Sequence, residues 1–191
     1  MNEFRLPLFP LHTVLFPGGV LPLRIFEPRY LDMVSDCLRN DHGFGVCLIR
    51  AGREVGAAAE CHEVGTLARI QDWDNTPEGL LAITARGERR FRVLDREVRA
   101  DLLSVARIEL LDEPPPQPLP VEFAPLARLL EHLLDDHDPP YKTLPRAFDD
   151  ADWVGARLTE LLPLDPLEKQ SLLEQADPRA RLTTLAARLG R

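Results

Sequence analysis

Residues able to bind metal occur in two groups of the chain. Cys61-His62-Glu63 places three potential ligands side by side, but neighbouring residues in an extended chain point to opposite faces and cannot all reach one ion. The second group comprises His132, Asp135, Asp136, His137 and Asp138. Its two histidines are five positions apart, so they miss the shared helical face that a spacing of four would give. We therefore predict no metal site and no cofactor.

Nucleophilic or nucleotide-dependent catalysis also lacks its usual pattern. Gly18-Gly19 leads into a strand-like run, and neither of the two lysines, Lys142 and Lys169, follows a glycine. A phosphate-binding loop needs glycines that lead into a helix, closed by a Lys-Ser/Thr pair. The three cysteines and five histidines have no spacing that selects a catalytic pair. We predict that the chain is not an enzyme.

One basic concentration provides an alternative function, RNA binding. It comprises Arg86, Arg89, Arg90, Arg92, Arg96 and Arg99. In a strand, alternation would place Arg90 and Arg92 on one solvated face, with Phe91 and Val93 on the other. The formal charge of −8 weighs against a general affinity for nucleic acid or an anionic membrane, because phosphate binding needs a basic face.

These side chains would be positioned by a strand-rich first part of the chain. Apolar alternation or continuous apolar runs predict strands over residues 4–9, 20–26, 44–49, 64–73, 80–94 and 102–110. Gly87 suits a bulge or a sharp bend in the long segment 80–94. One helix interrupts the strands, with Pro28 in its first turn and a predicted apolar stripe of Leu31, Val34 and Leu38.

The second part of the chain is predicted to be helical. Clustered prolines over residues 112–120 remove hydrogen-bond donors and favour an extended, semi-rigid connector. Apolar spacing predicts helices over residues 123–134 and 153–162, and Asp165-Pro166 and Asp177-Pro178 each predict a helix start. The predicted organisation is a β domain over 1–111, the connector over 112–120 and a helical subdomain over 121–191.

Composition and cysteine usage indicate a cytoplasmic protein. The chain is 45% apolar, which is enough for a substantial core, and no apolar run approaches the roughly 20 residues that span a bilayer. The start, MNEFRLPLFP, lacks the pattern of a secretion signal. Cys37, Cys47 and Cys61 have no CxxC spacing, so we expect reduced thiols rather than disulfides.

Four stretches, taken in order, resemble one known family. They are LPLFPLHTVLFPGGVLPLRIFEPRYLDMV (6–34), EVGTLARI (63–70), GERRFRV (87–93) and KQSLLE (169–174). Together they span nearly the whole chain and resemble the Lon protease N-terminal (substrate-binding) domain. The resemblance implies an α+β fold: a curled, PUA-like, mostly antiparallel β domain with one inserted helix, followed by a C-terminal helical bundle. It also implies binding of unfolded or tagged protein substrates.

The chain departs from a full Lon-type enzyme. Such an enzyme would have an ATPase module with a Gly-rich Lys-Ser/Thr loop and a proteolytic Ser-Lys dyad, and this sequence has neither. Lys169 and Ser171 both fall within the stretch that resembles the recognition region. We therefore expect a free-standing, non-catalytic module whose partners are protein or peptide clients, including unfolded polypeptide. Nucleic acid and membrane partners are not expected, and the oligomeric state is open.

Four residues are candidates for partner binding: Trp73, Tyr30, Arg24 and Arg29. Trp73 ends an apolar strand and enters a polar loop, where it would anchor a peptide if exposed. We favour the alternative that Trp73 caps the sheet core, because buried aromatics at strand ends are common. For Tyr30 the same two alternatives are open, an exposed anchor or a buried core residue, whereas Phe26 is predicted to be core. Arg24 and Arg29 would position acidic groups of a partner or pair with Glu27 or another carboxylate.

Overall fold

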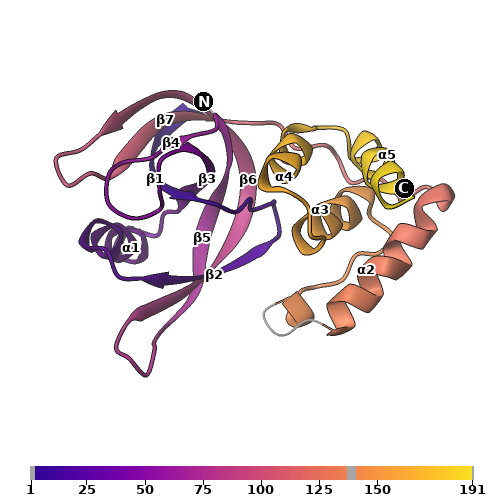
Figure 1. The fold of residues 1–191 in the computed structure, drawn as a ribbon, viewed down its shortest axis with the longest axis horizontal. Coiled ribbons are helices and arrows are strands. Elements are labelled where there is room, and N and C mark those ends of the chain that lie inside the picture. Colours follow the sequence, from indigo (N-terminus) through magenta and orange to yellow (C-terminus); the bar gives the residue numbers. More distant parts are fainter. Residues whose placement is uncertain (1–2, 137–140, 191) are drawn as a thin grey trace. The chain divides into compact units, whose positions relative to one another are not determined.

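A computed structural model describes residues 3–136 and 141–190 of the chain. The chain forms two compact units, Met1–Asp112 and Glu113–Arg191 (Figure 1). Every strand that the structure describes belongs to the first unit, together with one helix, and the second unit is helical. The predicted α+β class is confirmed. Within the described ranges, every helix is too short or too polar to cross a membrane.

The first unit is a closed, mostly antiparallel barrel (Figure 1). Its strands are β1 (Glu3–Leu11), β2 (Val20–Ile25), β3 (Phe44–Ala51), β4 (Glu60–Cys61), β5 (Val64–Asn75), β6 (Leu81–Val98) and β7 (Ser104–Leu110). They pair in the order β1-β7-β6-β5-β3-β4, and β1 also pairs with β3, in parallel, so the path closes on itself. β2 stands outside this ring and pairs with β6. The curled sheet expected from the sequence is therefore a ring with an attached strand.

β6 is the long bent strand that the sequence predicted around Gly87. Its register against β5 shifts there, because Ala68 pairs with Gly87 but Leu67 pairs with Arg89. Glu88 is the extra residue, which makes a β-bulge at this point. The bend lets the two parts of β6 pair with different neighbours: β2 pairs with the first part and β7 with the second.

Gly87 also explains the double glycine near the N-terminus. The Gly18 N–H donates to the Gly87 carbonyl over 2.8 Å, and the Gly87 N–H donates to the Gly19 carbonyl over 2.9 Å. A Cβ atom at position 87 would lie 2.3 Å from the Phe16 carbonyl oxygen. Only glycine allows this approach of the two backbones. The double glycine is thus a structural turn onto β6.

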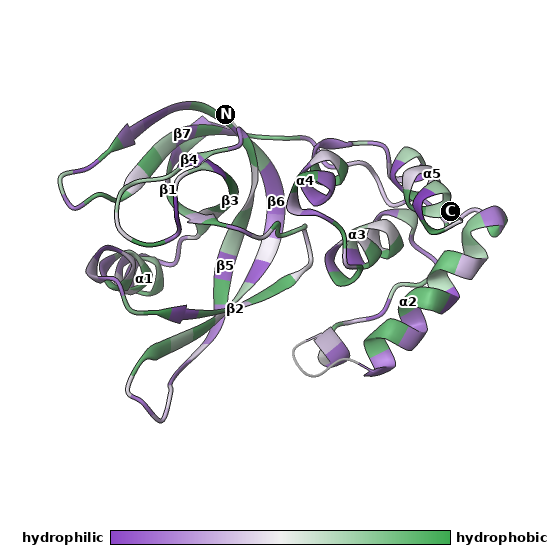
Figure 2. Cartoon of the chain, viewed as in Figure 1, coloured by the Kyte–Doolittle hydropathy of each residue, from purple (hydrophilic) through white to green (hydrophobic). Residues whose placement is uncertain are grey.

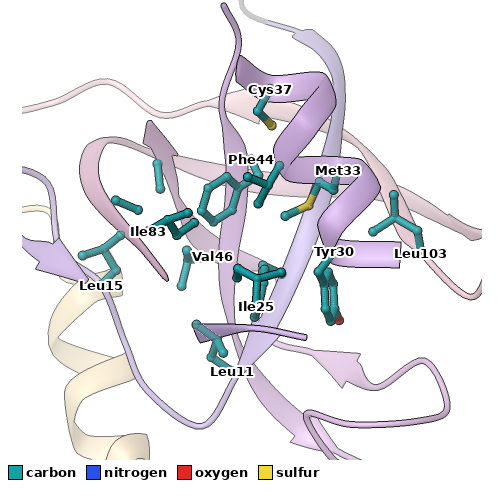
Figure 3. Packing of buried hydrophobic residues seen from close by; sticks show 14 of the residues in the cluster. Leu11, Leu15, Ile25, Tyr30, Met33, Cys37, Phe44, Val46, Ile83 and Leu103 are labelled. Atoms are coloured by element: carbon teal, nitrogen blue, oxygen red, sulfur yellow. The ribbon is translucent and has the colours of Figure 1, made fainter. Parts of the chain in front are cut away.

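Helix α1 (Pro28–Asn40) covers the main core of the first unit (Figure 3). Figure 3 shows Tyr30, Met33 and Cys37 of α1 directed toward Phe44, Val46 and Ile25 from the strands. The buried face of the helix also includes Val34, whereas Leu38 is 44% exposed. The predicted stripe of Leu31, Val34 and Leu38 is therefore wrong at Leu38.

The second unit contains four α-helices among its described residues, α2 (Ala124–Asp136), α3 (Ala151–Leu161), α4 (Pro166–Glu174) and α5 (Pro178–Leu189), with short 3-10 turns η1 (Val121–Phe123) and η2 (Tyr141–Thr143). Figure 2 shows hydrophobic and hydrophilic residues alternating along α2, as a helix with one buried face requires. Helix α3 packs against α2, α4 and α5.

Both predicted Asp-Pro helix starts are confirmed. The Asp165 carboxylate accepts from the Leu167 N–H over 2.8 Å, and the Glu168 carboxylate accepts in return from the Asp165 N–H over 3.1 Å. The Asp177 carboxylate accepts from the Arg179 N–H over 3.0 Å. These bonds satisfy amide groups that have no partner inside the helix.

Candidate functional site

The three most exposed large apolar side chains described in the first unit lie around β2. They are Phe26, Val55 and Trp73, which are 54%, 54% and 56% exposed. Figure 1 shows the β5–β6 hairpin projecting from the barrel, with β2 alongside it. Leu23 of β2 pairs with Ile83 of β6, and Ile83 pairs with Trp73 of β5, so one row crosses all three strands. Within this row Ile83 is buried, Leu23 is half-buried and Trp73 is exposed, so the core side of the sheet runs out into solvent at Trp73. Exposed apolar side chains beside one strand make this region a candidate binding surface.

Two hollows adjoin along β2. The edge hollow, of about 190 Å³, lies between β2 and the start of α1 and has apolar walls formed by Phe9, Leu11, Leu23, Phe26, Tyr30 and Val55. The sheet hollow, of about 510 Å³, is lined by Pro22, Leu23, Arg24, Asp72, Trp73, Asp74, Ala82, Ile83 and Thr84. Pro22, Leu23 and Arg24 line both. We call the residues Leu23, Arg24, Phe26, Val55 and Trp73 the β2 surface.

Tyr30 forms a fixed wall of the edge hollow, and Arg29 packs against its ring. Tyr30 is 5% exposed, and its ring stacks on Phe9 with 4.1 Å between centroids. The Arg29 guanidinium lies 4.6 Å from the centroid of the Tyr30 ring, and its Nη1 donates to the Leu102 carbonyl over 3.0 Å. Burial raises the pKa of Tyr30 to about 12. Both side chains are buried, but Tyr30 still lines the hollow, whereas Arg29 is not among its lining residues.

Two carboxylates hold the segment that carries Val55 beside this wall. Glu27 pairs with Arg29, with 3.0 Å between Oε2 and Nη2, and also accepts from the Gly56 N–H over 3.3 Å. Glu54 accepts from the backbone N–H of His12 over 2.6 Å. The side chain of Glu27 is mostly buried, which strengthens its pairing relative to a surface ion pair. The pairing of Arg29 with Glu27 is the simpler alternative posed from the sequence.

The other two candidates, Trp73 and Arg24, are exposed. The interpretation of Trp73 as a cap on the core is wrong, because β5 is buried at Val64–Thr66 but runs past the core and is exposed over its last residues. The prediction that Phe26 is core is also wrong. Ile25 takes the inward position, so Phe26, the next residue, faces away. A partner-binding role for Trp73 and Arg24 stays a prediction.

The arginine-rich strand does not form the solvated face expected for it. Arg90 is 3% exposed, and its Nη2 lies 3.4 Å from the Asp112 carbonyl oxygen. Arg89 donates to the Leu111 carbonyl over 2.9 Å. The segment that follows β7 therefore lies against this part of β6, and the prediction that Arg90 shares a solvated face with Arg92 is wrong.

The potential metal ligands and the pair Lys169 and Ser171 were the other candidates for chemistry in the sequence. Within the described ranges, no three His, Cys, Asp or Glu side chains come together to hold a metal ion. His137 and Asp138 of the second ligand group lie outside the described residues. Lys169 Nζ donates to the Glu160 carbonyl over 2.7 Å, and burial lowers its pKa. Ser171 lines a separate hollow between α4 and α5.

Known proteins match this chain over most of its length. Residues 5–189 match the family described as the ATP-dependent protease La (LON) substrate-binding domain. The crystal structure of a Lon N-terminal domain protein from Xanthomonas campestris is 42% identical, with a TM-score of 0.81, and the match covers 96% of this chain and 98% of that one.

Two further relatives are more distant. The N-terminal domain of a Mycobacterium avium complex Lon protease has a TM-score of 0.64 at 18% identity, covering 95% of this chain and 96% of that one, which is a likeness of fold. Lon protease 2 of Myxococcus xanthus is 29% identical over 97% of this chain. The chain spans only 23% of the length of that relative.

Proposed function

Because this chain belongs to the Lon protease substrate-binding domain family, we propose that it is a non-catalytic module that recognises proteins, and that extended or unfolded segments bind to its β2 surface. The observation that carries this proposal is the exposure of Phe26, Val55 and Trp73 around two adjoining hollows. Unfolded chains expose apolar side chains that native proteins bury. An apolar surface should therefore bind unfolded chains in preference to native proteins.

The chemistry of the β2 surface favours broad recognition of segments over recognition of one sequence. Its apolar members bind through contact area, which many apolar side chains provide. The two hollows also carry the carboxylates of Glu27, Glu54, Asp72 and Asp74 beside Arg24. We expect the apolar contacts to carry the affinity, which should then change little with salt. Nucleic-acid binding would instead weaken steeply with salt, because it releases counterions from phosphates. A salt titration therefore separates this proposal from the RNA alternative.

Catalysis has no support in the geometry of the Lys-Ser pair. Lys169 and Ser171 are two positions apart on α4, and side chains at that spacing do not face each other on a helix. Lys169 is also bonded to the Glu160 carbonyl. We propose that these residues are structural and that any chemistry on a bound client occurs elsewhere.

Fluorescence anisotropy with a labelled unfolded protein tests the proposal. The label is placed on a reduced, carboxymethylated protein that stays unfolded in native buffer, and the native form of the same protein is the comparison. We expect binding of the unfolded form only, weakened roughly tenfold by Trp73→Ala, as for an interface anchor. Leu167→Ala is the matched control, since Leu167 is 60% exposed on α4 and outside the β2 surface. Equal binding of both forms, or of neither, contradicts the proposal.

A further inference from the structure

β2 has one unpaired edge among the described residues. It pairs with β6 on one side, and no described strand pairs with its other side. Beyond the ring, the β2–β6–β5 part of the sheet has two open edges among the described residues: β2 on one side and, on the other, the part of β5 that follows its pairing with β3 at residues 66–68. Of these two edges, β2 adjoins the edge hollow. The edge hollow lies along this side, because its lining includes Pro22 and Arg24 together with Tyr30 of α1.

The backbone groups that face the open edge can be identified. The Gly19 carbonyl accepts from the Gly87 N–H, so Gly19 faces β6. Backbone direction alternates along an antiparallel strand, which makes Leu21, Leu23 and Ile25 face β6 as well. Pro22 supports this assignment, since a proline in a strand occupies a position whose nitrogen faces away from the partner. The groups directed outward therefore include the Pro22 carbonyl and both the N–H and the carbonyl of Arg24.

The edge hollow is the right size for one side chain. An engineered apolar cavity of about 150 Å³ in another protein binds benzene, and the edge hollow measures about 190 Å³. Its lining is mostly apolar, although Arg24, Glu27 and Glu54 also contribute to it, and the stacked rings of Phe9 and Tyr30 fix one wall. An aromatic or branched aliphatic side chain fits this volume and chemistry.

We infer that an extended segment of a bound protein adds to β2 as a further strand, pairs with the backbone of Arg24, and places one aromatic or branched aliphatic side chain in the edge hollow. This inference rests on the proposed function and narrows its substrate class. The segment must be extended and apolar at the positions that face the hollow, because side chains alternate along a strand. It must also have backbone groups free to pair, which folded proteins rarely expose.

A second copy of this chain is a poor occupant of the same edge. Pairing two β2 strands would bring a second Pro22 to an edge that already lacks one donor. In the register that is centred on Arg24, it would also bring two Arg24 side chains together, and like charges on facing strands are destabilising. The edge therefore disfavours pairing with a second β2 and leaves the backbone of Arg24 available to a strand of another kind.

Two substitutions at one position separate strand addition from side-chain contact. Arg24→Ala removes the side chain and keeps the outward N–H, whereas Arg24→Pro removes both. The ladder to β6 does not use this N–H, and Pro22 shows that the strand accepts proline at an outward position. Thermal unfolding of both variants checks that they fold. The probe is a labelled short peptide in which threonine and valine alternate and one valine is replaced by phenylalanine.

We expect Arg24→Pro to bind this peptide roughly tenfold more weakly than Arg24→Ala, the effect of one lost hydrogen bond at the interface. Replacing the phenylalanine of the peptide by alanine should weaken binding to all variants. Equal affinity of the two Arg24 variants overturns the inference. If the wild type binds the unfolded protein but not the peptide, strand addition is wrong and the proposed function stands; if it binds neither, the proposed function fails.

Amide hydrogen exchange in the wild-type chain gives an answer even if Arg24→Pro does not fold. Saturating peptide should slow exchange of the Arg24 amide roughly tenfold and leave the Leu23 amide, which already faces β6, unchanged. An unchanged Arg24 amide in the peptide complex overturns the inference.

Discussion

The ring of Tyr30 stacks on the ring of Phe9, with 4.1 Å between the centroids and 22° between the planes. This pair joins the first turn of α1 to β1 and forms one wall of the edge hollow. The Arg29 guanidinium lies over the same tyrosine ring. Contacts with the core therefore hold this wall of the hollow in place.

Titration of the tyrosine hydroxyl tests how deeply this wall is buried. The chain has two tyrosines, so Tyr141→Phe leaves Tyr30 as the only one. We expect its ultraviolet absorbance to titrate with a pKa of about 12 instead of 10.0, because burial disfavours the phenolate. A midpoint close to 10.0 in the folded variant would mean that water reaches the hydroxyl.

The same shift predicts a loss of stability in alkali. The folded chain holds the Tyr30 proton up to about pH 12, while the unfolded chain releases it near pH 10.0. Between these values the folded state binds more protons, so the free energy of unfolding falls as pH rises, by about 2–3 kcal/mol. In Tyr30→Phe, the free energy of unfolding measured with urea should not show this contribution to the decline between pH 10.0 and about 12. Parallel curves for wild type and variant would contradict it.

Gly87→Ala should destabilise the first unit strongly. The new methyl group would lie 2.3 Å from the Phe16 carbonyl oxygen and would force apart the backbone bonds to Gly18 and Gly19. We expect a loss of about 3 kcal/mol or failure to fold, measured by urea unfolding. Gly79→Ala is the control, because its methyl group meets open space and its positive φ of 79° costs only about 1 kcal/mol.

Trp73 should report client binding directly. The chain has two tryptophans, so Trp153→Phe leaves Trp73 as the only indole. Its side chain is 56% exposed, and contact with an unfolded client should shift its emission to shorter wavelength by excluding water. An unshifted spectrum at saturating client would remove Trp73 from the interface while leaving other parts of the β2 surface to be tested.

Asp165→Ala should weaken the start of α4. It removes the acceptor for the Leu167 N–H and breaks the reciprocal bond with Glu168. We expect a loss of about 1 kcal/mol in thermal unfolding. Asp165→Asn keeps an acceptor oxygen and should lose only a few tenths of a kcal/mol of stability. Equal losses of stability in the two variants would show that the charge of Asp165, and not its capping bond, stabilises the helix.

Much of the fold could be predicted because local signals agree with it. Asp-Pro pairs set helix starts through backbone bonding that needs no distant partner, and a glycine inside a strand pattern marks the bulge at Gly87. The exposure of Phe26 and Trp73 could not be predicted in the same way. It depends on where β2 and the β5–β6 hairpin run past the core, which is a property of the whole barrel.

Long-range placement also explains the remaining differences. Arg90 is buried because the segment after β7 lies against β6, and strand alternation alone cannot show that a later part of the chain covers a face. Val55 carries no sequence signal because it lies in a loop, and bonds to Glu27 and Glu54 from distant parts of the chain hold that loop beside the edge hollow. No local sequence pattern marks either arrangement.

The closure of the barrel by β1 has a consequence for how the chain folds. β1 pairs with β3 and with β7, so the first strand must find partners that include the last strand of its unit. During synthesis this ring cannot form until Leu110 has left the ribosome, and the long separation between paired residues makes its formation slow. Until then the edge of β1 that pairs with β7 is open, although β3 can already pair with the other edge. A nascent chain of this protein therefore itself presents the kind of extended apolar segment that its β2 surface is proposed to bind.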